Sequence, residues 1–60
     1  MNVNIKINVD NAAFGENYEN VEGEVKRIIN RIDFERLIRE DYSRPLVDIN
    51  GNKVGLVSIE

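Results

Sequence analysis

The chain has 60 residues and a formal net charge of −3, and it contains no cysteine and no histidine. A chain of this length forms one small core, since it buries only about 60% of the surface that its unfolded form exposes. The missing residue types exclude disulfides and thiolate metal sites, and they remove the commonest metal ligand and neutral-pH proton carrier. No apolar run reaches the length of a membrane span, and the N-terminus does not have the pattern of a signal peptide. We therefore expect a single cytosolic domain over residues 1–60 that needs no cofactor.

Residues 2–9 alternate strictly between apolar and polar side chains. This period predicts a half-buried strand with one wet face, on which Lys6 lies. Asp10 and Asn11 favour turns that bond their own backbone, so we expect the strand to end there. Residues 12–18 form a connection, in which the large apolar Phe14 is expected to pack over one end of the core.

Residues 19–32 have the spacing of an amphipathic helix. Asn17 or Asn20 is the expected N-cap, and Glu22 and Lys26 form an i,i+4 ion pair in the favourable orientation. The apolar stripe consists of Val21, Val25, Ile28, Ile29 and Ile32.

The apolar stripe does not continue smoothly beyond residue 32, which predicts a break or bend near Ile32–Asp33. Asp33 then begins a second helical segment, with Phe34, Leu37 and Ile38 facing inward. Residues 42–45 are expected to be a loop, because Pro45 disfavours a helical conformation at the preceding residue.

Residues 46–59 predict a hairpin, since Asn-Gly between two β-prone runs is a strong hairpin signal. A two-residue turn at 50–51 pairs Asp48 with Lys53 on the wet face. This register leaves Leu46, Val57 and Ile59 on the other face as an exposed apolar stripe, unless a bulge near Gly55 turns Val57 and Ile59 inward. The core face predicted by the two-residue turn consists of Val47, Ile49, Val54 and Leu56.

These elements predict an α+β fold, in which a three-stranded antiparallel sheet of order 2-3-1 carries on one face either one helix or one helix broken in two. The first strand is expected to lie antiparallel beside the last strand, after a right-handed crossover.

Catalytic constellations are weak in this sequence. Ser43 and Ser58 have no histidine to activate them. Glu19 and Glu22 share a helix face, but three strands leave little room for a cleft between two catalytic carboxyls. In DINGN, residues 48–52, the glycine is in the wrong position for a calcium loop, which predicts a turn and no metal site. We expect no enzymatic activity.

The most unusual segment is residues 9–24, VDNAAFGENYENVEGE, which contains no lysine or arginine. A negative surface of this kind repels nucleic acid and attracts basic protein surfaces. Acids near a helix N-terminus also stabilise the helix dipole, which accounts for part of this charge. The candidate partner-binding residues are Asp10, Glu16, Glu19, Glu22 and Glu24.

Three motifs together resemble a group of small phage and prophage accessory proteins: DNAAF at 10–14, ExxRI at 24–28 and LxDxNGNxVG at 46–55. The resemblance covers nearly the whole chain, although the central NRIDFERLIRED differs from the Ala/Leu-rich helix of many relatives. Proteins of this size in phages include anti-CRISPR inhibitors, and the resemblance implies such a role. It implies no catalytic residue.

The leading hypothesis is a phage- or prophage-encoded binding protein of the host cytoplasm that inhibits a defence complex by occupying a basic nucleic-acid-binding surface. One alternative is a dimerising accessory module that uses an apolar interface at Val57 and Ile59. The other is a nucleic-acid binder that uses the arginine-rich helix face, although acids interleaved with these arginines cancel most of their field.

Overall fold

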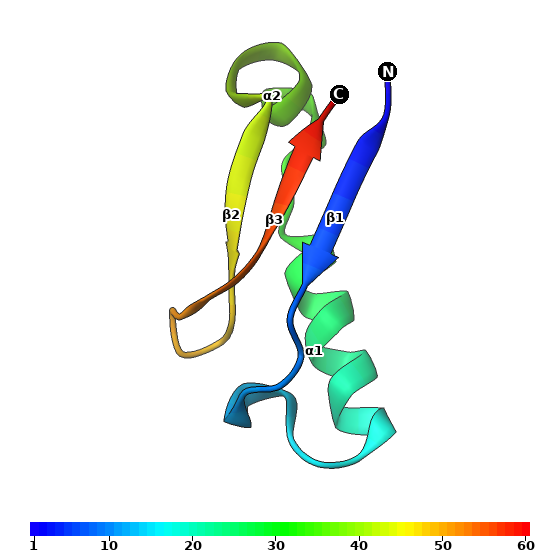
Figure 1. Cartoon of the computed structure of the whole chain (residues 1–60), viewed down its shortest axis with the longest axis vertical. Helices are drawn as coiled ribbons and strands as arrows, with labels where there is room; N and C mark the ends of the chain where they lie inside the picture. The colour runs from blue at the N-terminus through cyan, green and yellow to red at the C-terminus, as the bar shows by residue number, and fades with distance from the viewer.

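The computed structural model describes residues 1–60, which form an elongated molecule of 36 × 19 × 15 Å. One helical layer lies against one face of a sheet, and the chain termini lie together at the end opposite the start of the main helix (Figure 1). The elements in chain order are strand β1 (Val3–Ile7), the 3-10 turn η1 (Ala12–Phe14), helix α1 (Tyr18–Asn30), the short helix α2 (Phe34–Arg36), the π-helical turn η2 (Leu37–Asp41), strand β2 (Ser43–Val47) and strand β3 (Lys53–Ile59).

The predicted α+β fold and strand order are confirmed. The sheet has three strands in the order β1-β3-β2, and both pairs are antiparallel. The C-terminal strand is therefore the central one, and β1 and β2 form the two edges. No helix has the length and apolar character needed to cross a membrane.

The core lies between the sheet and the helical layer. Phe14 closes one end of it and is fully buried, as its size and apolarity predict. The partly buried Ile7 of β1 packs against the buried apolar residues, which come from η1, α1, η2, β2 and β3: Phe14, Ile28, Leu37, Leu46, Val54 and Val57.

The predicted helix break is confirmed. Helix α1 ends at Asn30, and Asp33 caps α2 by accepting a hydrogen bond from the N–H of Arg36 at 3.0 Å. Leu37 is fully buried, as expected. Phe34 and Ile38 are each 38% exposed, so the prediction that they face inward is wrong. Because this segment is only a few turns long, it buries one side chain fully and leaves its neighbours at the rim.

The hairpin is present, but its predicted register is wrong. Val47 pairs with Lys53 and Leu46 pairs with Gly55, which leaves Val54 as an extra residue in a bulge. Asp48 is buried and does not pair with Lys53 on the wet face. Of the predicted core face only Val54 is buried; the residues that are instead exposed are Val47, Ile49 and Leu56.

The bulge turns the end of β3 inward, which was the predicted alternative. Val57 is fully buried and Ile59 is half-buried against the core. The apolar interface proposed at Val57 is therefore wrong, because its side chain is not accessible to a partner. The predicted loop at 42–45 is also wrong, since β2 begins at Ser43 and contains Pro45; proline is compatible with an edge strand, where it need not donate to the ladder.

Gly55 lies where β3 passes very close to β1. A Cβ atom at this position would lie 1.9 Å from the carbonyl oxygen of Lys6, a contact that no side-chain rotation can relieve. Gly23, in contrast, has no atom within 4 Å of its hypothetical Cβ. The glycine in the sheet is therefore required by packing, and the glycine in α1 is simply tolerated.

We expect Gly55→Ala to lower the free energy of unfolding by about 3 kcal/mol or more, because β1 must move away from β3. The matched variant Gly23→Ala should raise it by about 0.5–1 kcal/mol, since alanine favours the helix. Urea unfolding followed by circular dichroism measures both changes. Equal effects of the two substitutions would contradict this assignment.

Candidate partner-binding surface

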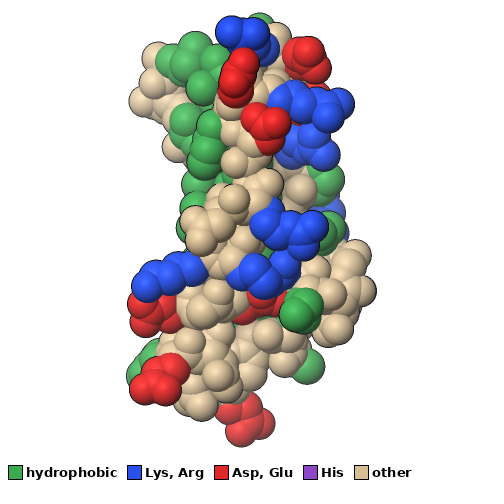
Figure 2. All heavy atoms as spheres, turned by 180° about the vertical axis from the view of Figure 1, so that it is seen from behind, with side chains coloured by type: hydrophobic (Ala, Val, Ile, Leu, Met, Phe, Trp, Pro, Cys, Tyr) green, Lys and Arg blue, Asp and Glu red, His purple; other side chains and the backbone are tan.

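Four of the five predicted acidic residues lie exposed at the end of the molecule that contains η1 and the start of α1. Figure 2 shows acidic side chains at this end, one of them beside a basic side chain, and we call it the acidic end. It consists of Asp10, Glu16, Glu19 and Glu22. Glu22 forms the predicted ion pair with Lys26, with 2.6 Å between Oε1 and Nζ. The other three carboxylates form no ion pair within the chain, so their field is available to a partner.

The backbone of the acidic end is held by asparagine caps. Asn11 Oδ1 accepts the N–H of Ala13 at 2.8 Å and begins η1, and Asn17 Oδ1 accepts the N–H of Asn20 at 2.9 Å and begins α1. Between them Gly15 adopts a φ of 67°, which other residues rarely tolerate. The carboxylates are thus presented from a defined turn, which lowers the entropic cost of binding.

Glu24 does not belong to the acidic end. It is only 8% exposed, its Oε1 accepts a hydrogen bond from Arg27 Nε, and its Oε2 accepts the N–H of Ile49 at 3.1 Å. Its assignment as a partner-binding residue is therefore wrong. The carboxylate instead joins α1 to the loop between β2 and β3, and its charge is compensated inside the chain.

Asp48 is the second buried acid, at 3% exposure. Its Oδ1 accepts the N–H groups of Asn50 and Asn52, both at 2.9 Å, and its Oδ2 accepts Asn11 Nδ2 at 2.8 Å. The side chain therefore closes the loop at 48–52 and attaches it to the start of η1. Two segments that are far apart in sequence, the acidic end and the hairpin loop, are joined by this carboxylate.

One of these buried acids had a signal in the sequence. Glu24 is three residues after Val21 and four before Ile28, so it lies on the apolar stripe of α1. An acid at such a position is expected to be paired and buried. For Asp48, the bonds from Asn50 and Asn52 are local, but the bond from Asn11, 37 residues away, has no local signal in the sequence.

The pKa values of both buried acids are lowered. For Glu24, the hydrogen bond from Arg27 is the main cause, and it outweighs the opposing effect of burial on the pKa. For Asp48, burial is the largest single effect and raises the pKa, but the donors from Asn52, Asn11 and Asn50 together reverse it. Both groups are therefore charged in the folded protein at neutral pH.

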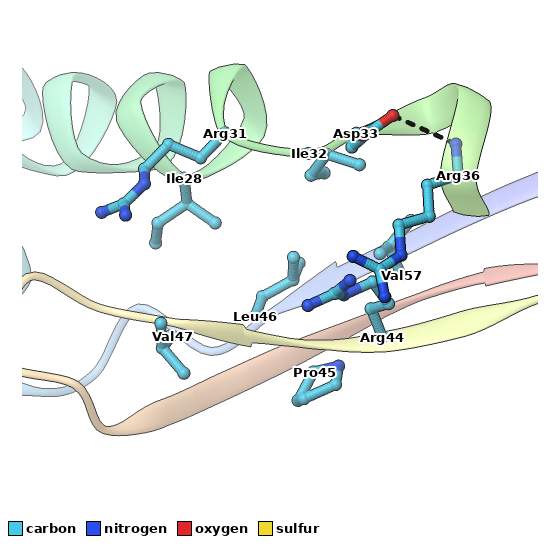
Figure 3. A pocket seen from close by; sticks show the side chains of 10 residues that line it. All are labelled: Ile28, Arg31, Ile32, Asp33, Arg36, Arg44, Pro45, Leu46, Val47 and Val57. Atoms are coloured by element: carbon cyan, nitrogen blue, oxygen red, sulfur yellow. Dashed lines mark hydrogen bonds between the residues drawn. The ribbon is translucent and has the colours of Figure 1, made fainter. Parts of the chain in front are cut away.

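An arginine-lined pocket of about 340 Å³ lies between the end of α1 and the edge strand β2. Its floor is apolar, and Arg31, Arg36 and Arg44 surround it (Figure 3). Asp41 Oδ2 lies 3.7 Å from Arg36 Nε and 3.3 Å from Arg44 Nη1, so one carboxylate serves two guanidinium groups. Arg31 forms no ion pair. The pocket has only a weak positive field, which provides little attraction for a nucleic-acid backbone.

No group of three or more histidine, cysteine, aspartate or glutamate side chains is placed to hold a metal ion. Glu19 and Glu22 share the exposed start of α1, and no pocket is lined by both. Ser43 is exposed on an edge strand.

Comparison with protein-family models, with curated proteins and with solved structures finds no match to this chain.

The lowered pKa values predict the pH dependence of stability. Both carboxylates have unfolded-state pKa values of about 4 and lower ones when folded, so their contribution is complete above about pH 5 and is lost as the pH falls through the folded-state values. We expect the thermal midpoint to fall on acidification from pH 6 to pH 2. In Asp48→Asn the midpoint should be lower at pH 6 and should change less with pH.

Asp10→Asn is the control for this experiment, because the exposed Asp10 carboxylate accepts no hydrogen bond within the chain. Its curve of thermal midpoint against pH should follow that of the wild type. Identical curves for Asp10→Asn and Asp48→Asn would show that the Asp48 network contributes nothing to stability.

Proposed function

We propose that this chain is a non-enzymatic binding protein, encoded by a phage or prophage, that inhibits a host defence complex in the bacterial cytoplasm. The acidic end occupies a basic surface on which the complex binds nucleic acid. The anti-CRISPR-like role rests on the resemblance of three sequence motifs, and the structure adds a surface that suits it. The supporting observation is a set of three exposed carboxylates, Asp10, Glu16 and Glu19, that form no ion pair within the chain.

The geometry favours this function over binding of nucleic acid by the chain itself. Arg36 and Arg44 share Asp41, while Arg39 lies 3.4 Å from Glu35. The arginine-rich face is thus largely neutralised, whereas the acidic end is not. An anionic surface attracts a basic protein groove, and exposed charges of this kind act mainly on the rate of association and on specificity.

Glu16 is the sharpest test of the acidic end. It is exposed, forms no ion pair and lies before the N-cap Asn17, so its substitution removes no capping hydrogen bond of α1. Glu60→Lys is a matched control, because it changes the net charge equally at the opposite end of the molecule (Figure 1). The target is first isolated by pull-down from host lysate and identified by mass spectrometry.

We expect Glu16→Lys to weaken binding to the isolated complex about tenfold at low salt, and Glu60→Lys to leave it nearly unchanged. The difference should shrink as the salt concentration rises from about 0.05 to about 0.5 M, because salt screens exposed charges. Affinity is measured by biolayer interferometry, and inhibition by plaque counts in cells that carry the defence system. Full inhibition by Glu16→Lys would exclude the charge-based model.

A further inference from the structure

The edge strand β1 has a complete row of free backbone groups. Asn2 and Glu60 exchange both of their backbone hydrogen bonds at 2.8 Å, and the N–H of Asn8 donates to Val54 at 2.7 Å. Because bonded positions alternate in an antiparallel ladder, the even-numbered residues of β1 bond to β3. The N–H and C=O groups of the odd-numbered residues point away from the sheet; these residues are Val3, Ile5 and Ile7.

The same odd-numbered residues carry apolar side chains that the helical layer covers only in part. Val3 is 45% exposed and Ile5 is 40% exposed. Figure 2 shows hydrophobic side chains gathered along this side of the upper half of the molecule. Free backbone groups and exposed apolar side chains thus occur together on one edge, which is the combination that promotes pairing with another strand.

The opposite edge has a feature that prevents such pairing. Strand β2 contains Pro45, which has no N–H, and Arg44 beside it carries a charge on the helix-facing side, opposite Val57. Strand β1 has no proline and no charge on its helix-facing side, since Lys6 lies on the other face. Only one of the two edges is therefore open to extension.

We propose that β1 pairs antiparallel with β1 of a second copy, so that two sheets join into one six-stranded sheet. The occupant follows from self-complementarity. With Ile5 opposite Ile5 of the partner on a two-fold axis, Val3 faces Ile7 at both ends, and all three outward positions form bonded pairs. This register creates about six new backbone hydrogen bonds and continues the apolar face across the junction.

The charges agree with this arrangement. In the proposed register Lys6 faces Asn4 of the second copy, so like charges do not meet on the wet face. The acidic end follows directly after β1, and antiparallel pairing therefore places the two acidic ends at opposite ends of the dimer. A parallel arrangement would bring them together and be opposed by their repulsion. The dimer leaves both acidic ends accessible, so this inference goes beyond the proposed function and does not depend on it.

The test uses Ile5→Lys, which places two ammonium groups against each other at the two-fold axis, with Val47→Lys as the matched control. Val47 is 44% exposed on the opposite edge strand, so the Val47→Lys substitution adds the same charge at a similarly exposed apolar position. Sedimentation equilibrium from about 10 µM to about 1 mM covers the range of weak association. We expect dimers for the wild type and Val47→Lys, and at least tenfold weaker association for Ile5→Lys.

Amide hydrogen exchange of the wild type tests the same proposal without a substitution. The amides of Val3, Ile5 and Ile7 should become protected as the concentration rises, whereas those of Asn4 and Lys6 should be protected throughout. A wild type that stays monomeric to 1 mM, or odd-numbered amides that exchange equally at all concentrations, would overturn the proposal. Loss of association in Val47→Lys alone would place the interface on the other edge.

Discussion

The hydrogen bonds of the Asp48 carboxylate determine the geometry of the hairpin, and the rest of the fold depends on that hairpin. By accepting the N–H groups of Asn50 and Asn52, Asp48 closes a loop wider than a two-residue turn. The strands then meet with Val54 bulged, and this bulge brings Val57 to the helix-facing side of the sheet. Since β3 is the central strand, its register also sets the position of β1, and with it the place from which the acidic end extends.

The identity and order of the helices and strands follow from local patterns in the sequence. The alternation of apolar and polar side chains predicts β1. The helical spacing of apolar residues predicts α1, and the interruption of that spacing near Asp33 predicts the break. The Asn50-Gly51 pair predicts a hairpin. The register was predicted wrongly because Asp48 closes the loop by accepting the N–H groups of Asn50 and Asn52, which replaces the expected two-residue turn with a wider loop and a bulge at Val54. Ile49 is exposed because it lies in the loop beyond β2, and Val47 is exposed where the register shifts.

For the candidate site, too, the sequence predicts the acidic segment but not the role of each acidic residue. Composition marks residues 10–24 as unusual, but it treats every carboxylate alike. The structure separates them by burial and pairing. Glu24 is buried and hydrogen-bonded, and Glu22 forms an ion pair with Lys26 at the surface. Only Asp10, Glu16 and Glu19 are left without a cation. Burial of Glu24 follows from its helical position, and its bond to Ile49 requires knowledge of where the hairpin loop lies.

The small core of this chain bears on the role of the edge strand β1. A core of six buried apolar residues is small even for 60 residues, and such a chain gains much from any added burial. Along β2 the chain blocks extension with Pro45, while β1 remains open and partly apolar. If pairing were harmful, a single charge on the helix-facing side of β1 would prevent it. The absence of such a charge at Val3, Ile5 and Ile7 fits an edge that a second copy covers, with the acidic ends directed away from the junction.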